Sequence, residues 1–476
     1  MAAAYLKSGS QEKEAVFHLF FRNHPFQGGY TVAAGLEPVV HFLENLSFCD
    51  DDLVYLRSLK GTGEVPLFDP EFLVYLKDFR FACNVDAVPE GTVVFPHQPI
   101  LRVSGPIMQA QLIETALLNI INFQSLIATK AARICQAAQG DPVIEFGLRR
   151  AQGPDGALSA TRASFIGGCT STSNVLAGKL FGIPVKGTHA HSWVMSFEDE
   201  WDAFEAYAEA MPHNSVYLVD TYDTLEGVAQ AIRIGRKLRE EGHDLTGIRL
   251  DSGDLAYLSI EARALLDEAG FEKTAIIASS DLDEHLIQEL KNQGAKISIW
   301  GVGTRLASAY DQPALGGVYK LGAVREPGGD WQPRIKISER SIKTTTPGIL
   351  QIRRFRQGNM YLGDALYDIN TPLPETMCIV DPADSNRRKI IPKSVGGTDL
   401  LQPVFRKGQR VYTLPSLRDI QQNTRDELQR FHQGIRRFSN PHEYPAGLEL
   451  TLHEMKQSLI QREREKKENS IRKDSL

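Results

Sequence analysis

The chain has 476 residues, which is too long for one ordinary hydrophobic core and predicts two or three domains. Its 42% hydrophobic and 24% charged residues are typical of a folded protein. The 53 Lys and Arg side chains nearly balance the 59 Asp and Glu side chains, which argues against a nucleic-acid partner. Five scattered cysteines without a CxxC pair argue against a disulfide framework and a structural zinc site. Without a signal peptide or a membrane-spanning apolar run, the expected location is cytoplasmic, with no membrane partner.

Residues 1–140 are predicted to form an N-terminal α/β domain. Residues 36–46 have the spacing of an amphipathic helix. Residues 91–106 contain two short strand-like runs that are broken by prolines. Residues 107–138 are apolar on more than one side, which predicts a long, buried helix with one interruption.

Residues 141–341 show short apolar runs that alternate with helical segments. The runs lie at 143–146, 183–186, 216–220, 247–251, 275–279, 297–301 and 317–321. They lack inside/outside alternation, as expected of parallel strands covered on both faces. An α/β-barrel is the predicted catalytic domain, and a doubly wound sheet is the alternative.

Residues 342–476 are predicted to form a C-terminal domain with a helical tail. An antiparallel pattern over its first part gives way to helices, and Ser416 occupies the N-cap position of one of them. The last helix is expected over residues 448–467. The charged tail that follows is assigned no function.

Polar, charged and glycine residues follow the predicted strands, where the active site of a barrel lies. The two glycines of residues 301–304 allow close approach of the backbone to a phosphate. Alone they would indicate a tight turn, but their position late in the barrel favours a phosphate site. Arg149, Arg150 and Arg305 can supply positive charge to the same group. Asp251 is expected to bind a ribose hydroxyl, whereas Asp254 is interpreted as a helix cap.

His189 and His191 are two residues apart, so on a strand they would face the same way. Such a pair can begin the metal site of an amidohydrolase, which is the rival enzyme hypothesis. Further ligands at later strand ends are missing from the sequence. His189 is therefore interpreted as structural, and His191 as a reactive nitrogen oriented by Asp220.

Longer segments resemble the nicotinate phosphoribosyltransferase family, in that family's order along the chain. They are EFGLRRAQGPDGALSATRASFIGGCTSTSNVLAG (145–178), GTHAHSW (187–193), VDTYDT (219–224), GIRLDSGDL (247–255) and WGVGT (300–304), with SLIATKAAR (125–133) upstream and GGVYKL (316–321) downstream. The resemblance covers nearly the whole chain. It is far more specific than any single glycine motif.

The resemblance implies an irregular α/β-barrel of the type II phosphoribosyltransferases, flanked by an N-terminal α/β domain and a C-terminal domain. It implies a homodimer with active sites at the interface. The implied reaction joins nicotinate to PRPP (phosphoribosyl pyrophosphate), giving nicotinate mononucleotide and pyrophosphate as the first step of NAD salvage from nicotinic acid. ATP is the co-substrate, and Mg²⁺ accompanies PRPP and ATP.

The family's functional residues map onto this sequence by position. His191 matches the histidine that ATP transiently phosphorylates, and Asp220 matches its supporting carboxylate. Phe146 and Arg249 match residues that line the pyridine pocket, and Asp251 matches the ribose contact. The other expected substrate contacts are Arg149, Ser192, Ser280, Gly301, Gly303 and Thr304. Nicotinate is expected rather than nicotinamide, because Arg249 can counter a carboxylate.

One departure from the family pattern lies at the start of the chain. The family usually begins with a segment like TDLYxLTMA, whose tyrosine stacks on the pyridine ring in the neighbouring subunit's site. This chain starts where that segment would be ending, so Tyr5 is not assigned the stacking role. A catalytically inactive relative is therefore a further alternative. Quinolinate phosphoribosyltransferase is the nearest other enzyme, but it should lack a GTHAHSW-type segment.

Overall fold

A computed structural model describes residues 1–474 of the chain. The described chain forms two compact units, each considered by itself. The first unit contains Met1–Ser125 together with the chain from Leu315 onward, and the second contains Leu126–Ala314. The segments 1–140 and 342–476 therefore fall largely in one unit. The predicted division into three domains stays a prediction.

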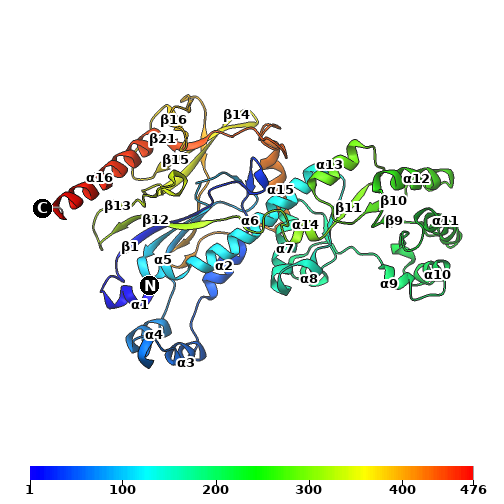
Figure 1. Cartoon of the computed structure of the whole chain (residues 1–476), viewed down its shortest axis with the longest axis horizontal. Helices are drawn as coiled ribbons and strands as arrows, with labels where there is room; N and C mark the ends of the chain where they lie inside the picture. The colour runs from blue at the N-terminus through cyan, green and yellow to red at the C-terminus, as the bar shows by residue number, and fades with distance from the viewer. Residues whose placement is uncertain (475–476) are drawn as a thin grey trace. The chain divides into compact units, whose positions relative to one another are not determined.

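The second unit is built on a six-stranded parallel sheet (Figure 1). In spatial order its strands are β7 (Ser171–Thr172), β6 (Val143–Glu145), β11 (Ile299–Val302), β10 (Ala275–Ala278), β9 (Gly247–Leu250) and β8 (Val216–Leu218). The two edge strands, β7 and β8, do not pair with each other, so the sheet stays open as a curled half-barrel. The predicted α/β class is confirmed.

Helices connect these strands, and acidic or amide side chains cap several of them. The helices are α7 (Gly153–Gly167), α8 (Val175–Phe181), α9 (His191–Val194), α10 (Glu200–Ala210), α11 (Thr224–Glu240), α12 (Leu255–Glu268), α13 (Glu284–Asn292) and α14 (Thr304–Ala307). Asn174, Asp199, Asp223, Asp254 and Asp283 each accept a backbone N–H at a helix start. Because parallel strands end where these helices begin, the caps hold the polar edge of the sheet in place.

Two of the seven runs predicted as strands of the parallel sheet do not belong to it. Residues 183–186 form a single bridge between Thr172 and Val185, because Pro184 has no N–H to extend a ladder. Residues 317–321 belong to β12 (Val318–Arg325), which pairs antiparallel with β1 (Glu14–Phe20) in the first unit. A short apolar run does not specify which sheet it joins. The two-residue strand β7 was too short to be recognised from the sequence.

The first unit contains two larger sheets and a two-stranded one. The antiparallel sheet has the order β13 (Gln332–Pro333), β12, β1, β5 (Leu101–Pro106), β3 (Asn84–Ala87), β19 (Gln402–Arg406) and β20 (Gln409–Arg410). The mixed sheet has the order β17 (Arg388–Ile391), β16 (Met377–Val380), β21 (Ala446–Glu449), β15 (Met360–Asp368), β14 (Leu350–Gln357) and β18 (Gly397–Asp399). The small sheet pairs β2 (Thr31–Val32) with β4 (Val93–Val94).

Most helices predicted for this part of the chain are confirmed. They are α2 (Leu36–Asn45), the interrupted pair α5 (Ile107–Leu112) and α6 (Glu114–Ala137), α15 (Leu417–Gln429) and the last helix, α16 (Leu450–Asp474). Ser416 caps α15 by accepting the Asp419 N–H, as predicted. The helices α1 (Ala2–Lys7), α3 (Asp50–Ser58) and α4 (Pro70–Lys77) complete the unit, and α6 continues into the second unit.

A buried arginine joins several elements of the first unit. Arg354 on β14 forms a two-bonded ion pair with Asp364 on β15, at 2.9 and 2.7 Å, and contacts Glu427 on α15 at 2.8 Å. It also donates to the carbonyl of Val93 on β4. Its side chain is 2% exposed, so each charge depends on its partner.

Replacing Arg354 with Met should lower the free energy of unfolding of the first unit by about 3–5 kcal/mol, because two buried carboxylates lose their countercharge. Arg353→Met is the matched control: the neighbouring Arg353 also makes a two-bonded pair, with Asp399, but is 29% exposed. That pair should contribute about 1 kcal/mol or less. Urea unfolding followed by circular dichroism measures both. Equal losses in the two variants would contradict a special role for Arg354.

Candidate active site

The candidate active site lies at the carboxyl edge of the parallel sheet in the second unit. Phe146 directly follows β6, Asp251 follows β9 and Ser279 follows β10, while Asp220 lies two residues beyond β8. Arg249 is the penultimate residue of β9, with its side chain directed to the same group. The strand ends of a parallel α/β sheet are where substrates bind, so this edge is the natural catalytic centre.

Arg249 is the hub of the site. Its guanidinium donates from Nε to Ser279 Oγ at 2.8 Å, from Nη1 to Thr188 Oγ1 at 3.0 Å, and from Nη2 to Asp251 Oδ1 at 2.7 Å. These bonds join β9, the end of β10 and the loop before α9. The side chain is 18% exposed, so part of its positive charge still faces solvent and can meet an anionic ligand.

Asp251 is held in its ionised form. Its burial opposes ionisation, but a short hydrogen bond from Ser279 Oγ and the adjacent Arg249 guanidinium outweigh that effect and lower the pKa of Asp251. The carboxylate is 31% exposed. Asp251 can therefore accept hydrogen bonds from a ligand's hydroxyl groups.

His191 and Asp220 form the second half of the site. His191 begins the short helix α9, and its Nδ1 lies 3.1 Å from Thr221 Oγ1. Its Nε2 lies 3.8 Å from Asp220 Oδ1 and 3.9 Å from Asp251 Oδ2. The imidazole is 39% exposed, whereas the Asp220 side chain is 1% exposed. A partly exposed imidazole thus lies in front of a buried carboxylate.

The Asp220 carboxylate is oriented by hydrogen bonds to one of its two oxygens. Oδ2 accepts the Asp251 N–H at 2.9 Å and the Ser252 hydroxyl at 2.6 Å. Oδ1 is buried and has no hydrogen-bond partner among the described residues, on the side that faces His191. Nearby Glu200 has its pKa raised to about 7 by burial, with the charges of Asp220 and Asp223 adding to the effect. Partial protonation of Glu200 near neutral pH limits the negative charge around Asp220.

Phe146 provides an apolar surface beside these polar groups. The Arg249 guanidinium carbon lies 5.7 Å from the centre of its ring. A Cβ atom at Gly301 would lie 2.8 Å from two carbons of the same ring, so residue 301 must lack a side chain for the ring to pack there. A planar ligand with a negative charge therefore finds an aromatic face and a guanidinium side by side.

Comparisons with known proteins agree with this geometry. The model of the nicotinate phosphoribosyltransferase family matches residues 142–358, the model of that enzyme's N-terminal domain matches 1–122, and that of its C-terminal domain matches 351–456. The nicotinate phosphoribosyltransferase of Bacillus subtilis is 47% identical over 453 residues, which cover 94% of this chain and 90% of the relative.

The chain belongs to the nicotinate phosphoribosyltransferase family.

A solved structure also matches over nearly the whole chain. The crystal structure of human nicotinic acid phosphoribosyltransferase is 33% identical, covers 96% of this chain and 98% of the human chain, and has a TM-score of 0.84. A nicotinate-nucleotide pyrophosphorylase from Pyrococcus furiosus, at 23% identity and a TM-score of 0.68, shares the fold. No described helix is both long and apolar enough to cross a membrane.

The structure brings together several of the residues predicted from the family resemblance. His191, Asp220, Arg249 and Asp251 lie in one connected group, and Phe146 and Gly301 pack beside it. Gly303 is the N-cap of α14, which Thr304 begins. The catalytic and binding roles of these residues stay predictions.

The other predicted contacts lie on exposed loops around the sheet edge. Arg149 belongs to the short 3₁₀ helix Leu148–Arg150 and is exposed. Ser192 is exposed beside His191, and Ser280 is exposed beyond β10. Ser280 has a φ of 127°, which is a strained conformation for a residue with a side chain. Strain of this kind is concentrated at ligand sites, which is consistent with a binding role for Ser280.

The structure also gives the two histidines of the H-x-H pair different environments. His189 accepts the Leu218 N–H at its Nε2, and burial lowers the pKa of His189 to about 4. Its structural interpretation is confirmed, as is that of Asp254, which caps α12. Among the described residues, no group of three or more His, Cys, Asp or Glu is placed to hold a metal ion. Family membership removes the amidohydrolase alternative.

The sequence did not reveal the hydroxyl groups that connect the site. Thr188, Thr221 and Ser279 each bond to a predicted residue. They lie next to predicted residues in the chain, but serine and threonine are common at helix caps and turns, so their presence alone carries little signal. The one available cue is position, since Ser279 follows a parallel strand directly.

Replacing Ser279 with Ala should raise the pKa of Asp251, because the ionised carboxylate loses a hydrogen bond while its burial persists. The pKa can be followed by NMR in protein labelled with ¹³C at the aspartate carboxyl groups, with Asp251→Asn used for assignment. Ser280→Ala is the matched control, since Ser280 is adjacent but makes no bond to Asp251 that the structure records. An unchanged Asp251 pKa in Ser279→Ala would refute the role given to Ser279.

Proposed function

We propose that this chain transfers the ribose 5-phosphate of PRPP to the ring nitrogen of nicotinate, giving nicotinate mononucleotide and pyrophosphate. The transfer is coupled to hydrolysis of ATP to ADP and phosphate through phosphorylation of His191. One observation carries the proposal: the partly exposed His191 ring directs Nε2 towards the buried Asp220, and the same group of side chains contains an arginine packed beside a phenylalanine. Family membership supports the same reaction.

The pyridine ring of nicotinate is assigned to the face of Phe146. Arg249 lies beside that ring and carries N–H donors beyond those that its three recorded bonds use. A carboxylate is the anion that best matches a guanidinium fork. Because nicotinamide lacks this negative charge, Arg249 favours nicotinate.

The ribose of PRPP is assigned to Asp251, whose ionised carboxylate can accept hydrogen bonds from ribose hydroxyls. The phosphates are assigned to exposed Arg149 and to the backbone at the start of α14, where Gly303 and Thr304 present N–H groups. Departure of pyrophosphate leaves an oxocarbenium-like ribose carbon, which the pyridine nitrogen attacks. The transfer needs no bond between sugar and protein, so catalysis rests on positioning and charge stabilisation.

His191 is the proposed acceptor of the γ-phosphoryl group of ATP. If the Nδ1 proton is donated to Thr221 Oγ1, the lone pair of the neutral ring lies on Nε2, the nitrogen that faces the carboxylates. Attack by Nε2 on the γ-phosphorus releases ADP, and water later releases phosphate. Asp220 stabilises the positive charge that develops on the ring.

Mg²⁺ is the metal that the proposed substrates bring. It binds through one or two carboxylates together with phosphate oxygens and water, rather than through a complete protein cage. The buried and unpartnered Asp220 Oδ1 and the ionised Asp251 are the oxygen donors suited to it. When bound, Mg²⁺ neutralises phosphate charge near these carboxylates.

Two further expectations extend the proposal to the assembly and its location. The family resemblance implies a homodimer in which the neighbouring subunit contributes to each active site. A cytoplasmic location agrees with a cysteine pattern suited to a reducing compartment. The reaction makes the first intermediate of NAD salvage from nicotinic acid.

His191→Ala should abolish the stimulation of turnover by ATP and the appearance of acid-labile phosphate on the protein, while nicotinate and PRPP still react slowly. The assay is PRPP-dependent pyrophosphate release with nicotinate, nicotinamide and quinolinate in parallel, each with and without ATP. His213→Ala is the control, because His213 is an exposed histidine of the same unit that packs against His243. Retained ATP stimulation in His191→Ala, or a preference for quinolinate, would overturn the proposal.

Arg249→Lys should lower kcat/KM for nicotinate about 10- to 100-fold, since charge-assisted hydrogen bonds contribute about 1.5–3 kcal/mol. A lysine keeps the charge but loses the planar fork. Arg263→Lys is the matched control: Arg263 is also 18% exposed, and it bonds to Asp267 and to two backbone carbonyls. The fall for nicotinate should exceed any rise in the KM for PRPP, which is expected because Arg249 also bonds to Asp251, the proposed ribose contact. Equal kcat/KM for Arg249→Lys and wild type would rule out carboxylate recognition by Arg249.

A further inference from the structure

Two neighbouring segments at the carboxyl edge of the parallel sheet carry proposed substrate contacts. The loop after β10 contains Ser280 and leads into α13, and the segment after β11 contains Gly303 and leads into α14. The strands β10 and β11 pair with each other in the sheet. A group that bonds to both segments therefore sets the spacing of their substrate contacts.

Lys130 of α6 bonds to both segments. Its ammonium group lies 2.6 Å from Oε2 of Glu284, the first residue of α13, and donates at 2.7 Å to Oδ2 of Asp311, in the turn after α14. The exposed fractions of the Lys130 and Glu284 side chains are 0% and 1%. A charge this deeply buried is tolerated only with close partners of opposite charge. Because the Lys130 side chain does not reach solvent, it acts on a ligand only through the elements that it joins.

Two arginines extend this set of charges. Arg133, one turn further along α6, donates from Nε to Glu284 Oε1 at 2.7 Å. Arg305 of α14 lies 3.3 Å from Asp311 and 3.7 Å from Asp283, the N-cap residue of α13. The cations of α6 and α14 thus face carboxylates from the start of α13 and from the turn after α14. A charge-balanced set exerts little net attraction on a phosphate, so its main effect is to fix the geometry of the elements that it joins.

The two carboxylates beside Lys130 are held in their ionised form. Burial opposes the ionisation of Glu284, but the charges of Lys130 and Arg133 outweigh that effect and lower the pKa of Glu284. Burial likewise opposes the ionisation of Asp311, and the hydrogen bond and charge of Lys130 lower its pKa. Removal of the ammonium group would therefore leave two negative charges facing each other between the two segments. Their repulsion would favour separation of the segments.

The loop after β10 has a backbone that needs support from its surroundings. Ser280 has a φ of 127°, and the Leu282 N–H bonds to the Ser280 carbonyl at 2.7 Å. At the end of the loop, Asp283 Oδ1 accepts the N–H groups of the next two residues of α13 that it can reach, at 3.0 and 2.8 Å. A strained conformation persists only where the contacts around it are strong enough to hold it. Lys130 supplies such a contact at Glu284, directly after this cap.

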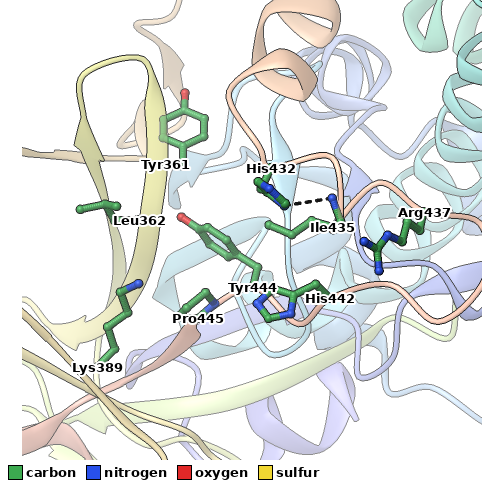
Figure 2. A pocket seen from close by; sticks show the side chains of 10 residues that line it. Tyr361, Leu362, Lys389, His432, Ile435, Arg437, His442, Tyr444 and Pro445 are labelled. Atoms are coloured by element: carbon green, nitrogen blue, oxygen red, sulfur yellow. Dashed lines mark hydrogen bonds between the residues drawn. The ribbon is translucent and has the colours of Figure 1, made fainter.

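A buried ion pair alone does not indicate a role in positioning substrate contacts. In the first unit, Arg354 pairs with the buried carboxylates of Asp364 and Glu427. The hydroxyls of Tyr361 and Tyr444 donate to the same carboxylates. Figure 2 shows both tyrosine rings beside a recess of about 330 Å³. The elements joined there, β14, β15, α15 and the loop before β21, carry none of the proposed substrate contacts, whereas both segments joined in the second unit carry one.

We propose that Lys130 is a positioning residue for PRPP, which holds the segments after β10 and β11 at the spacing that this substrate requires. The inference rests on the proposed function, which assigns PRPP to this edge of the sheet. With Lys130 in place, the segments are set before the substrate arrives, so that binding does not have to order them. Without Lys130, PRPP has to draw the segments together. The affinity for PRPP then falls, while the bound complex stays the same.

Lys130→Met should raise the KM for PRPP about tenfold or more, while kcat at saturating substrates stays within about twofold of wild type. The KM for nicotinate should change less than that for PRPP. A purely structural role predicts a different pattern, because loss of folded protein lowers the apparent kcat and leaves the KM for PRPP unchanged.

Lys291→Met is the matched control. Lys291 lies near the other end of α13 and pairs with Asp141, before β6 at the amino edge of the sheet, at 2.7 Å. The control removes an ion pair from the same helix without touching either of the joined segments. Its KM for PRPP and its kcat should match those of wild type.

Isothermal titration calorimetry with PRPP and Mg²⁺, without nicotinate or ATP, measures the same effect in the absence of turnover. Lys130→Met should weaken PRPP about tenfold or more, and Lys291→Met should not. The double variant Lys130→Met/Glu284→Gln covers a failure of the single variant to fold. It removes the link without leaving Glu284 as an uncompensated buried carboxylate, and the glutamine oxygen can still accept from Arg133. The double variant should show the same loss of affinity.

Wild-type affinity and KM for PRPP in the folded Lys130 variants would overturn the inference. A fall in kcat with an unchanged KM for PRPP would overturn it too, as would an equal effect of Lys291→Met. Failure of the wild-type protein to bind PRPP would instead refute the proposed function on which the inference rests. The two failures are therefore distinguishable.

Discussion

The candidate active site depends on the guanidinium group of Arg249. This group contacts the end of β10 through Ser279, the loop before α9 through Thr188, and its own strand end through Asp251. The contacts form a chain, because the Asp251 N–H in turn orients Asp220, whose other oxygen faces His191. A planar fork accepts only a narrow range of partner positions, so one side chain fixes both the Phe146 side and the His191 side of the site. The half-barrel brings the strand ends together, and the hydrogen bonds of Arg249 hold their polar groups in fixed positions.

Much of this arrangement could be predicted because it follows from local sequence. A buried parallel strand is a short apolar run, and the residue that follows it must lie at the carboxyl edge of the sheet. That rule places Phe146 and Asp251 at the carboxyl edge from the sequence, and Arg249 lies one residue before the end of the strand that Asp251 follows. Helix caps are similarly local, which explains why Ser416 and Asp254 were identified from the residues alone. The predicted α/β class rests on the same alternation of strands and helices.

The parts that could not be predicted depend on distant contacts. Residues 317–321 resemble a parallel strand, but they pair with a strand near the start of the chain, and nothing local specifies that partner. The failure of the strand at 183–186 matters more for the site. On a strand, His189 and His191 would share a face; instead His189 is buried against Tyr207 and Tyr217, and His191 starts a helix. Their different environments therefore arise from tertiary packing, although the residues alone already favoured a structural role for His189 and a reactive role for His191.

The contrast in exposure between His191 and Asp220 bears on the proposed coupling of ATP hydrolysis to transfer. A histidine that is 39% exposed is reachable by ATP, but its phosphorylated form is equally reachable by water. Burial of Asp220 strengthens its electrostatic effect on the His191 imidazole, but it does not shield the imidazole from solvent. The protein part of this site therefore does not by itself prevent futile hydrolysis. In the proposed mechanism, protection of the phosphohistidine therefore has to come from what occupies the space in front of it, either substrates or the neighbouring subunit of the proposed dimer.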